Sequence, residues 1–161
     1  MSLPDPDSHP ELFDGILIRR SIAYLIDVLI LTVMVWALVI FGVIAGFLTF
    51  GLFWVALPFV LPVAVLVYYA ATLGGPARAT IGMRMMDIVL TPARGRPLDG
   101  WRILIHPILF WITVWIIWPA IFVVVLFTPR RQTLHDLVTG TLMVRRSPME
   151  RHWRRVGELP A

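Results

Sequence analysis

The sequence predicts an all-α membrane protein: a transmembrane helical hairpin and a third helical segment that is membrane-embedded, interfacial or re-entrant, with a small cytoplasmic β element. Of 161 residues, 58% are apolar and 15% charged, whereas soluble domains carry about 25% charged residues. Val28–Ala77 contains no Asp, Glu, Lys, Arg or His, and Ile103–Pro129 contains only His106. Uncharged stretches this long cannot be hidden in so small a domain, so we expect them to face lipid, which excludes a soluble enzyme.

The uncharged run Val28–Ala77 is long enough for two spans of roughly 20 residues each. We expect helices at Ser21–Ile44 (21–44) and Phe50–Ala71 (50–71), joined by a tight turn at Ala45–Thr49. The positive-inside rule places both outer ends of this hairpin in the cytoplasm, because arginines flank them: Arg19, Arg20, Arg78 and Arg84.

Two tails of opposite charge are expected to flank a membrane domain at residues 19–146. The N-terminal tail, 1–18, carries four acidic residues and no basic one, the reverse of a signal-peptide n-region. The C-terminal tail, 147–161, is basic, and together with Trp153 it indicates a surface anchor or disorder.

A polar loop at 74–102 follows the hairpin, and Gly74-Gly75-Pro76 at its start ends the second helix. The loop carries five Arg against two Asp, and Ile81–Leu90 lacks helical periodicity. We therefore expect a short strand at Arg84–Leu90, paired with Thr141–Val144 in the polar motif 130–146.

The third apolar segment, 103–127, is long enough to cross a membrane. However, a single crossing would place the arginines of the loop and of motif 130–146 on opposite faces. Trp111, Trp115 and Trp118 share one helical face near its middle, whereas Trp prefers the interface, and Pro119 interrupts a helix there. These facts favour an interfacial helix, or a re-entrant hairpin bent at Pro119, over a third span.

Asp27 is the most informative residue because it lies about 9 Å inside the first predicted helix. An ionised Asp within a span costs roughly 2.5–3.5 kcal/mol and needs a partner. Arg20 shares its face, with Tyr24 between them, but helical side chains tilt toward the N-terminus, so Arg20 is expected to reach lipid phosphates. The partner is expected elsewhere, as a structural ion pair or within a proton or cation site: Arg78, Arg84, Arg102 or His106.

Two further patterns lie in the hairpin. Pro58 and Pro62 remove backbone donors from the second helix, which indicates either a tolerated kink or a broken helix of the kind that lines cation sites. Gly42 and Gly46 form a GxxxG pair, a close-packing face for the neighbouring helix or a second subunit.

No feature supports enzymatic chemistry. The sequence has no Cys and no metal-ligand spacing, so we expect no catalytic residues, cofactor or metal. His135 and Asp136 are adjacent and would diverge by about 100° on a helix, so no dyad is expected. We expect Asp136 to act as a structural clasp among Arg130, Arg131 and the loop arginines, accepting backbone donors at a helix start.

Four stretches resemble the RDD family of bacterial membrane proteins: Arg20–Asp27, Thr80–Arg84, Gly95–Leu98 and Arg130–Thr141. The resemblance covers roughly Leu12 to Arg146. It implies that the family's signature Arg and two Asp fall on Arg20, Asp27 and Asp136. It also implies a role that is poorly settled, since transport of an unidentified ligand is suggested and cation/proton exchange is proposed for some members.

The sequence therefore leads to two function hypotheses. The first is a small transporter or transporter component for a cation, a proton or an unidentified ligand, which must oligomerise because two spans cannot enclose a pathway. The alternative is a non-transporting assembly or interaction protein that docks partners on its basic face. We expect the bacterial inner membrane, cytoplasmic termini, anionic lipid against the arginines, and a homo-oligomer or membrane partner; no nucleic acid is expected.

Overall fold

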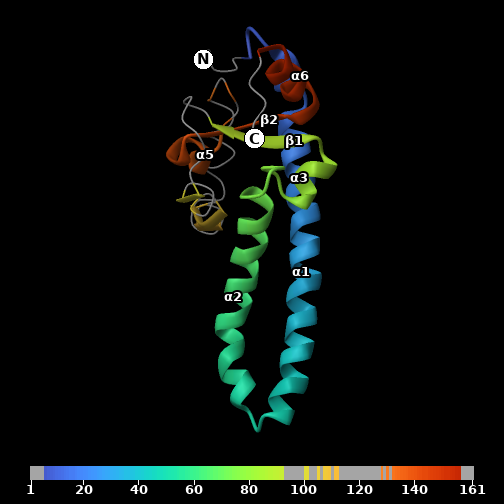
Figure 1. Cartoon of the computed structure of the whole chain (residues 1–161), viewed down its shortest axis with the longest axis vertical. Helices are drawn as coiled ribbons and strands as arrows, with labels where there is room; N and C mark the ends of the chain where they lie inside the picture. Colours follow the sequence, from blue (N-terminus) through green and yellow to red (C-terminus); the bar gives the residue numbers. More distant parts are fainter. Residues whose placement is uncertain are drawn as a thin grey trace.

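A long helical hairpin dominates the structure, and all the smaller elements gather at one end of it (Figure 1). In this computed structural model, residues 6–92, 100–101, 105, 107–109, 111–112, 128, 130 and 132–156 are described. The hairpin consists of α1 (Ile16–Leu48) and α2 (Leu52–Leu73). We call the smaller elements together the cap: η1 (Pro10–Leu12), α3 (Ile81–Met85), β1 (Ile88–Pro92), α5 (Leu134–Thr139), β2 (Thr141–Arg145) and α6 (Arg146–Val156).

Both hairpin helices are long and apolar enough to cross a membrane. Within their most apolar windows only 11% and 6% of residues are buried, so neither is the core helix of a soluble domain. α1 begins before and ends after the expected 21–44, and α2 is shifted by two residues from 50–71. The helix continues through Arg19 and Arg20 because their side chains find polar partners in the cap.

The two helices pack closely near the turn that joins them. A Cβ added at Gly42 would overlap Leu57, and one added at Gly46 would overlap the Trp54 ring. The predicted GxxxG face therefore packs against the neighbouring helix. α2 is continuous through Pro58 and Pro62, so a broken helix is not observed and the two prolines are tolerated within it.

A two-stranded antiparallel sheet crosses the cap, with Ile88 opposite Arg145 and Pro92 opposite Thr141. The predicted pairing is confirmed, but the first strand starts later than expected because residues 81–85 form α3. Thr80 caps α3 by accepting a hydrogen bond from the Met83 amide. Asp87, at φ 57°, ends this helical stretch and redirects the chain into β1.

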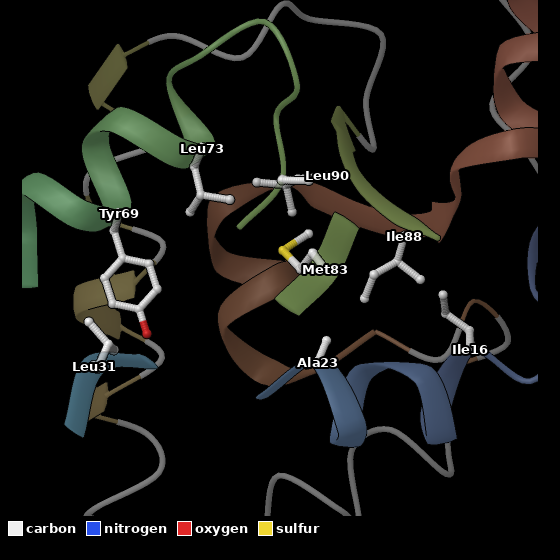
Figure 2. Packing of buried hydrophobic residues seen from close by; sticks show 9 residues of the cluster. Ile16, Ala23, Leu31, Tyr69, Leu73, Met83, Ile88 and Leu90 are labelled. Carbon is white, nitrogen blue, oxygen red and sulfur yellow. The ribbon is translucent and has the colours of Figure 1, made fainter. Parts of the chain in front are cut away.

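One hydrophobic cluster joins the hairpin to the cap. Its side chains come from α1, α2, the chain after α2, α3 and β1 (Figure 2): Ile16, Ala23, Leu31, Tyr69, Leu73, Ala79, Met83, Ile88 and Leu90. This cluster fixes the cap on the open end of the hairpin.

A second hydrophobic cluster contains residues from both expected tails. Leu12 and Phe13, expected in an acidic tail, pack with Met149 and Trp153 of α6 against the sheet. Residues 146–156 are therefore helical and folded onto the cap, not a disordered tail. Charge counting missed this because few apolar residues, correctly spaced, are enough to bury one side of a short polar helix.

The third apolar segment is described only in part. Trp111 packs against the first hydrophobic cluster, which places its ring beside the hairpin and cap. Trp115, Trp118 and Pro119 lie outside the described residues, so the choice between interfacial, re-entrant and spanning arrangements stays a prediction.

Candidate functional site

The Asp27 carboxylate lies where α1, α2 and α3 meet, and it is 6% exposed. Among the described residues, three groups donate to it. The Tyr68 hydroxyl donates to Oδ1 at 2.7 Å, the Gly82 amide to Oδ1 at 2.9 Å, and the Thr80 hydroxyl to Oδ2 at 2.5 Å. One carboxylate therefore ties three segments of the chain together; we call this group the Asp27 knot.

Local sequence makes the Asp27 knot possible. Gly82 lies against the Ala23 carbonyl of α1, and a Cβ there would overlap that oxygen. Only glycine lets the α3 backbone come close enough for its amide to reach Asp27. Thr80 is the N-cap of α3, so its hydroxyl both accepts from the Met83 amide and donates to the carboxylate.

Among the described residues, the groups that bind Asp27 are neutral donors rather than the expected cations. Of the four expected cationic partners, Arg84 is exposed and donates from Nε to the Ala79 carbonyl at 3.2 Å. Arg78 is half-buried in the loop before α3, and Arg102 and His106 lie outside the described residues. Neutral donors replace the expected cation because hydroxyl and amide groups satisfy a carboxylate without the cost of burying a second charge.

The position of Asp27 along α1 can be compared with the thickness of a membrane. The rise from Asp27 to Leu48 along α1 is about 32 Å, close to the roughly 30 Å thickness of the hydrocarbon core. The part of α1 before Asp27 packs against the cap. Asp27 therefore lies where the hairpin meets the cap.

A second polar group joins α1 to α5. An Arg20 guanidinium nitrogen, Nη2, lies 2.6 Å from Asp136 Oδ2 and donates to the Thr133 hydroxyl at 3.2 Å. Asp136 also accepts from the Thr133 amide at 3.0 Å, completing a capping box at the start of α5. Arg20, Thr133, His135 and Asp136 together form what we call the Arg20 knot.

The Arg20 knot corrects one prediction and refines another. Arg20 binds Asp136 instead of reaching lipid phosphates, because the helix extends back past it and α5 lies beside it. Asp136 does accept a backbone donor at a helix start, as expected. Among the described residues, Asp136 forms an ion pair with Arg20, and Arg131, one of the expected partners, lies outside the described residues.

His135 and Asp136 are closer than their adjacency suggested. His135 is buried, its Nε2 lies 2.9 Å from the Thr133 hydroxyl oxygen, and the same nitrogen is 3.6 Å from Asp136 Oδ1. Side chains in the first helical turn lean back toward the N-cap, so both converge on Thr133. Adjacent residues on a helix diverge by about 100°, and the ends of these two side chains meet because both reach back to Thr133.

The other expected residues lie around these knots or away from them. Tyr24 is half-buried on α1, three positions before Asp27. Pro58 and Pro62 are exposed within α2, in the hairpin. Sequence reasoning missed Tyr68, Thr80 and Thr133 because uncharged hydroxyls were not considered as partners for buried carboxylates.

The knots contain Arg20, Asp27 and Asp136, the three residues onto which the resemblance places the family's signature Arg and two Asp. The RDD family model matches residues 15–140, a range that includes both knots completely. No curated protein and no solved structure matches the chain at a significant level. The family and the two apolar helices indicate a membrane protein. The chain belongs to the RDD family.

Proposed function

We propose that the chain is a non-transporting membrane assembly or interaction protein, in which the hairpin is the anchor and the cap is a docking module. The observation that carries this proposal is the Asp27 knot. Its carboxylate accepts hydrogen bonds from Tyr68, Thr80 and Gly82, an arrangement that fastens α3 and α2 to α1. A carboxylate used in this way stabilises the cap and needs no ion to satisfy it.

The proposal includes an orientation in the bacterial inner membrane with the cap in the cytoplasm. The Arg distribution supports it: all fourteen basic residues are arginines, and none lies between Val28 and Ala77, where the far turn of the hairpin is. Anionic lipid on the cytoplasmic side would neutralise arginines of the cap. The docking partner in this proposal is a second copy or another membrane protein, and we propose no catalytic activity.

A second candidate function is transport of a proton or cation through Asp27. The grouping of a carboxylate with two hydroxyls, those of Tyr68 and Thr80, favours it, because such oxygens bind cations and exchange protons. Two spans cannot enclose a pathway, so this function would require an oligomer. Transport would also require the donors to Asp27 to exchange repeatedly for an ion, which would loosen the contact between hairpin and cap.

The variant Asp27→Asn separates the two functions. Because Oδ1 accepts from both Tyr68 and Gly82, the amide oxygen can take that place. In the wild-type chain the Thr80 hydroxyl donates to the carboxylate. In the variant the new NH₂ can donate to the Thr80 hydroxyl oxygen, so the direction of this hydrogen bond reverses. The variant should therefore fold while losing the charge and the exchangeable proton of the carboxylate.

The experiment compares cells that make the wild-type chain, Asp27→Asn and Asp27→Ala. The proposed function predicts that Asp27→Asn accumulates and leaves ion-dependent growth unchanged, whereas Asp27→Ala accumulates poorly because its buried donors lose their acceptor. Loss of ion-dependent growth in an Asp27→Asn protein that accumulates normally would reject the assembly role and support transport.

A further inference from the structure

The two sides of the cap differ in the residues that they expose. On the side far from the hairpin, α6 buries Met149 and Trp153 and exposes Ser147, Arg151 and Arg154. This is the ordinary pattern of a surface helix in water. The elements next to the hairpin, α3 and α5, show the opposite pattern (Figure 1).

α3 exposes apolar side chains beside α1. Ile81 and Met85 are one helical turn apart and therefore share a face, and the Met85 side chain is 63% exposed. The buried residues of α3, Gly82 and Met83, face α1 and the first hydrophobic cluster. Arg84 is exposed between Ile81 and Met85 along the chain, so α3 presents apolar side chains together with one cation.

α5 shows the same pattern on the other side of the hairpin (Figure 1). Leu137 and Val138 are both exposed, and Val138 reaches 66%. Meanwhile its polar residues His135 and Asp136 are buried in the Arg20 knot. A helix that buries its charged residue and exposes its aliphatic residues fits an apolar environment better than water.

An exposed apolar stripe on α1 extends from the hairpin to the level of the cap. Leu29, Val33 and Trp36 are exposed on α1, in the part of the helix that runs alongside α2. Ile18, Ile22 and Leu25 continue this exposed stripe toward the cap. α1 has 33 residues, a length of about 50 Å, whereas the bilayer with its headgroup layers is about 40–45 Å thick. The beginning of α1 therefore lies within or just beyond the headgroup layer, beside α3.

We propose that α3 and α5 lie in the headgroup layer and that Ile81, Met85, Leu137 and Val138 insert among the first acyl carbons of the lipids. The occupant of this surface is the phospholipid bilayer. Continuity with the apolar surface of the hairpin supports lipid, and so does Arg84, whose guanidinium complements a phosphate headgroup. The inference requires only that the hairpin crosses a membrane, so it holds for both candidate functions.

Depth measurements with single spin labels test this inference, and the chain has no native Cys. The labelled variants are Met85→Cys, Val138→Cys, Leu29→Cys as the lipid reference and Arg151→Cys as the water reference. In vesicles of phosphatidylcholine and phosphatidylglycerol, collisions with oxygen report lipid and collisions with a water-soluble nickel chelate report water. All four positions are exposed, so each variant should keep the fold.

The expected ratio of oxygen to nickel accessibility at positions 85 and 138 lies between the references and closer to that of position 29. A ratio equal to that of position 151 would place α3 and α5 in water and overturn the inference. Shielding from both reagents would also overturn it, because a protein, such as a second copy, would then cover the surface.

The contribution of Arg84 has its own test. In the background Arg84→Gln, the label at position 85 should become shallower, and its depth should no longer depend on the phosphatidylglycerol content of the vesicle. The matched control is Arg154→Gln on α6, which should leave the depth unchanged. Unchanged depth in Arg84→Gln would reject a phosphate contact at this residue.

Discussion

Arg20 Nη2 and Asp136 Oδ2 lie 2.6 Å apart although 116 positions separate the two residues in the chain. Arg20 is in the second turn of α1, and Asp136 is in the first turn of α5. The contact thus fastens the beginning of the family's matched region to its end. Both side chains are nearly enclosed, at 12% and 0% exposed, so the ion pair is largely shielded from water.

The Arg20 knot predicts a strong loss of stability when one partner is removed. Asp136→Asn should lower the free energy of unfolding by about 3–5 kcal/mol, because it removes one member of an enclosed ion pair. Arg20→Gln should lower the free energy of unfolding by a similar amount, because it removes the other member of the pair. Thermal denaturation in detergent measures both losses.

The double variant Arg20→Gln/Asp136→Asn is the control for this pair. The double variant removes the whole ion pair, and because the two residues are in contact, it should lose much less stability than the sum of the two single losses. Additive losses would show that the two side chains do not stabilise each other. A stable, well-accumulated Asp136→Asn that loses all activity would instead place Asp136 in a functional site.

Gly82 should tolerate no side chain. Gly82→Ala introduces a methyl group that overlaps the Ala23 carbonyl oxygen, and overpacking of this kind costs about 1–3 kcal/mol. It should also move the Gly82 amide away from Asp27. The matched control is Gly100→Ala, where no atom lies within 4 Å of the added Cβ. Equal melting temperatures for the two variants would contradict the close approach of α3 to α1.

Trp153 tests whether the chain after β2 is part of the fold. It is 8% exposed and packs with Leu12, Phe13 and Met149. Trp153→Ala should cost about 3–5 kcal/mol and speed hydrogen exchange in β1 and β2, which this cluster covers. The neighbouring exposed Arg154→Ala serves as the control and should change neither. If the segment were disordered or only a lipid anchor, Trp153→Ala and Arg154→Ala would have the same stability and the same hydrogen exchange.

The orientation of the hairpin predicts which sites are reachable from outside the cell. In a chain without native Cys, Thr49→Cys in the hairpin turn should react with an impermeant maleimide added to intact cells. Ser147→Cys at the start of α6 should react only after the membrane is opened. Labelling of Ser147→Cys in intact cells would place the cap outside and reject the proposed topology.

The two hairpin helices and the two short strands could be predicted from sequence because the signal of each element is local. An uncharged run has only a few ways to satisfy its backbone, and Gly42 and Gly46 indicate a close helix contact. The limits of α1 were missed because Arg19 and Arg20 look like membrane-end charges. Their partners, the Met86 carbonyl and Asp136, are distant in the chain. The sequence of the helix itself does not indicate these partners.

The site was predictable in its acidic residues but not in their partners. Asp27 stands out because an acid in an apolar helix needs compensation. A search restricted to cations led to Arg78 and Arg84, whereas the structure uses Tyr68, Thr80 and a glycine amide. Those donors come together only after α2 and α3 are placed against α1, and this tertiary arrangement has no signature within any one segment.

The most direct measurement of the central claim is ion flux in proteoliposomes that contain the purified wild-type chain or Asp27→Asn. The assay uses a panel of cations and a pH-sensitive dye inside the vesicles. Our account, in which Asp27 is a structural acceptor, predicts that both proteins give the same traces as empty liposomes. Flux of a cation or proton through the wild-type protein that disappears in a folded Asp27→Asn would contradict it.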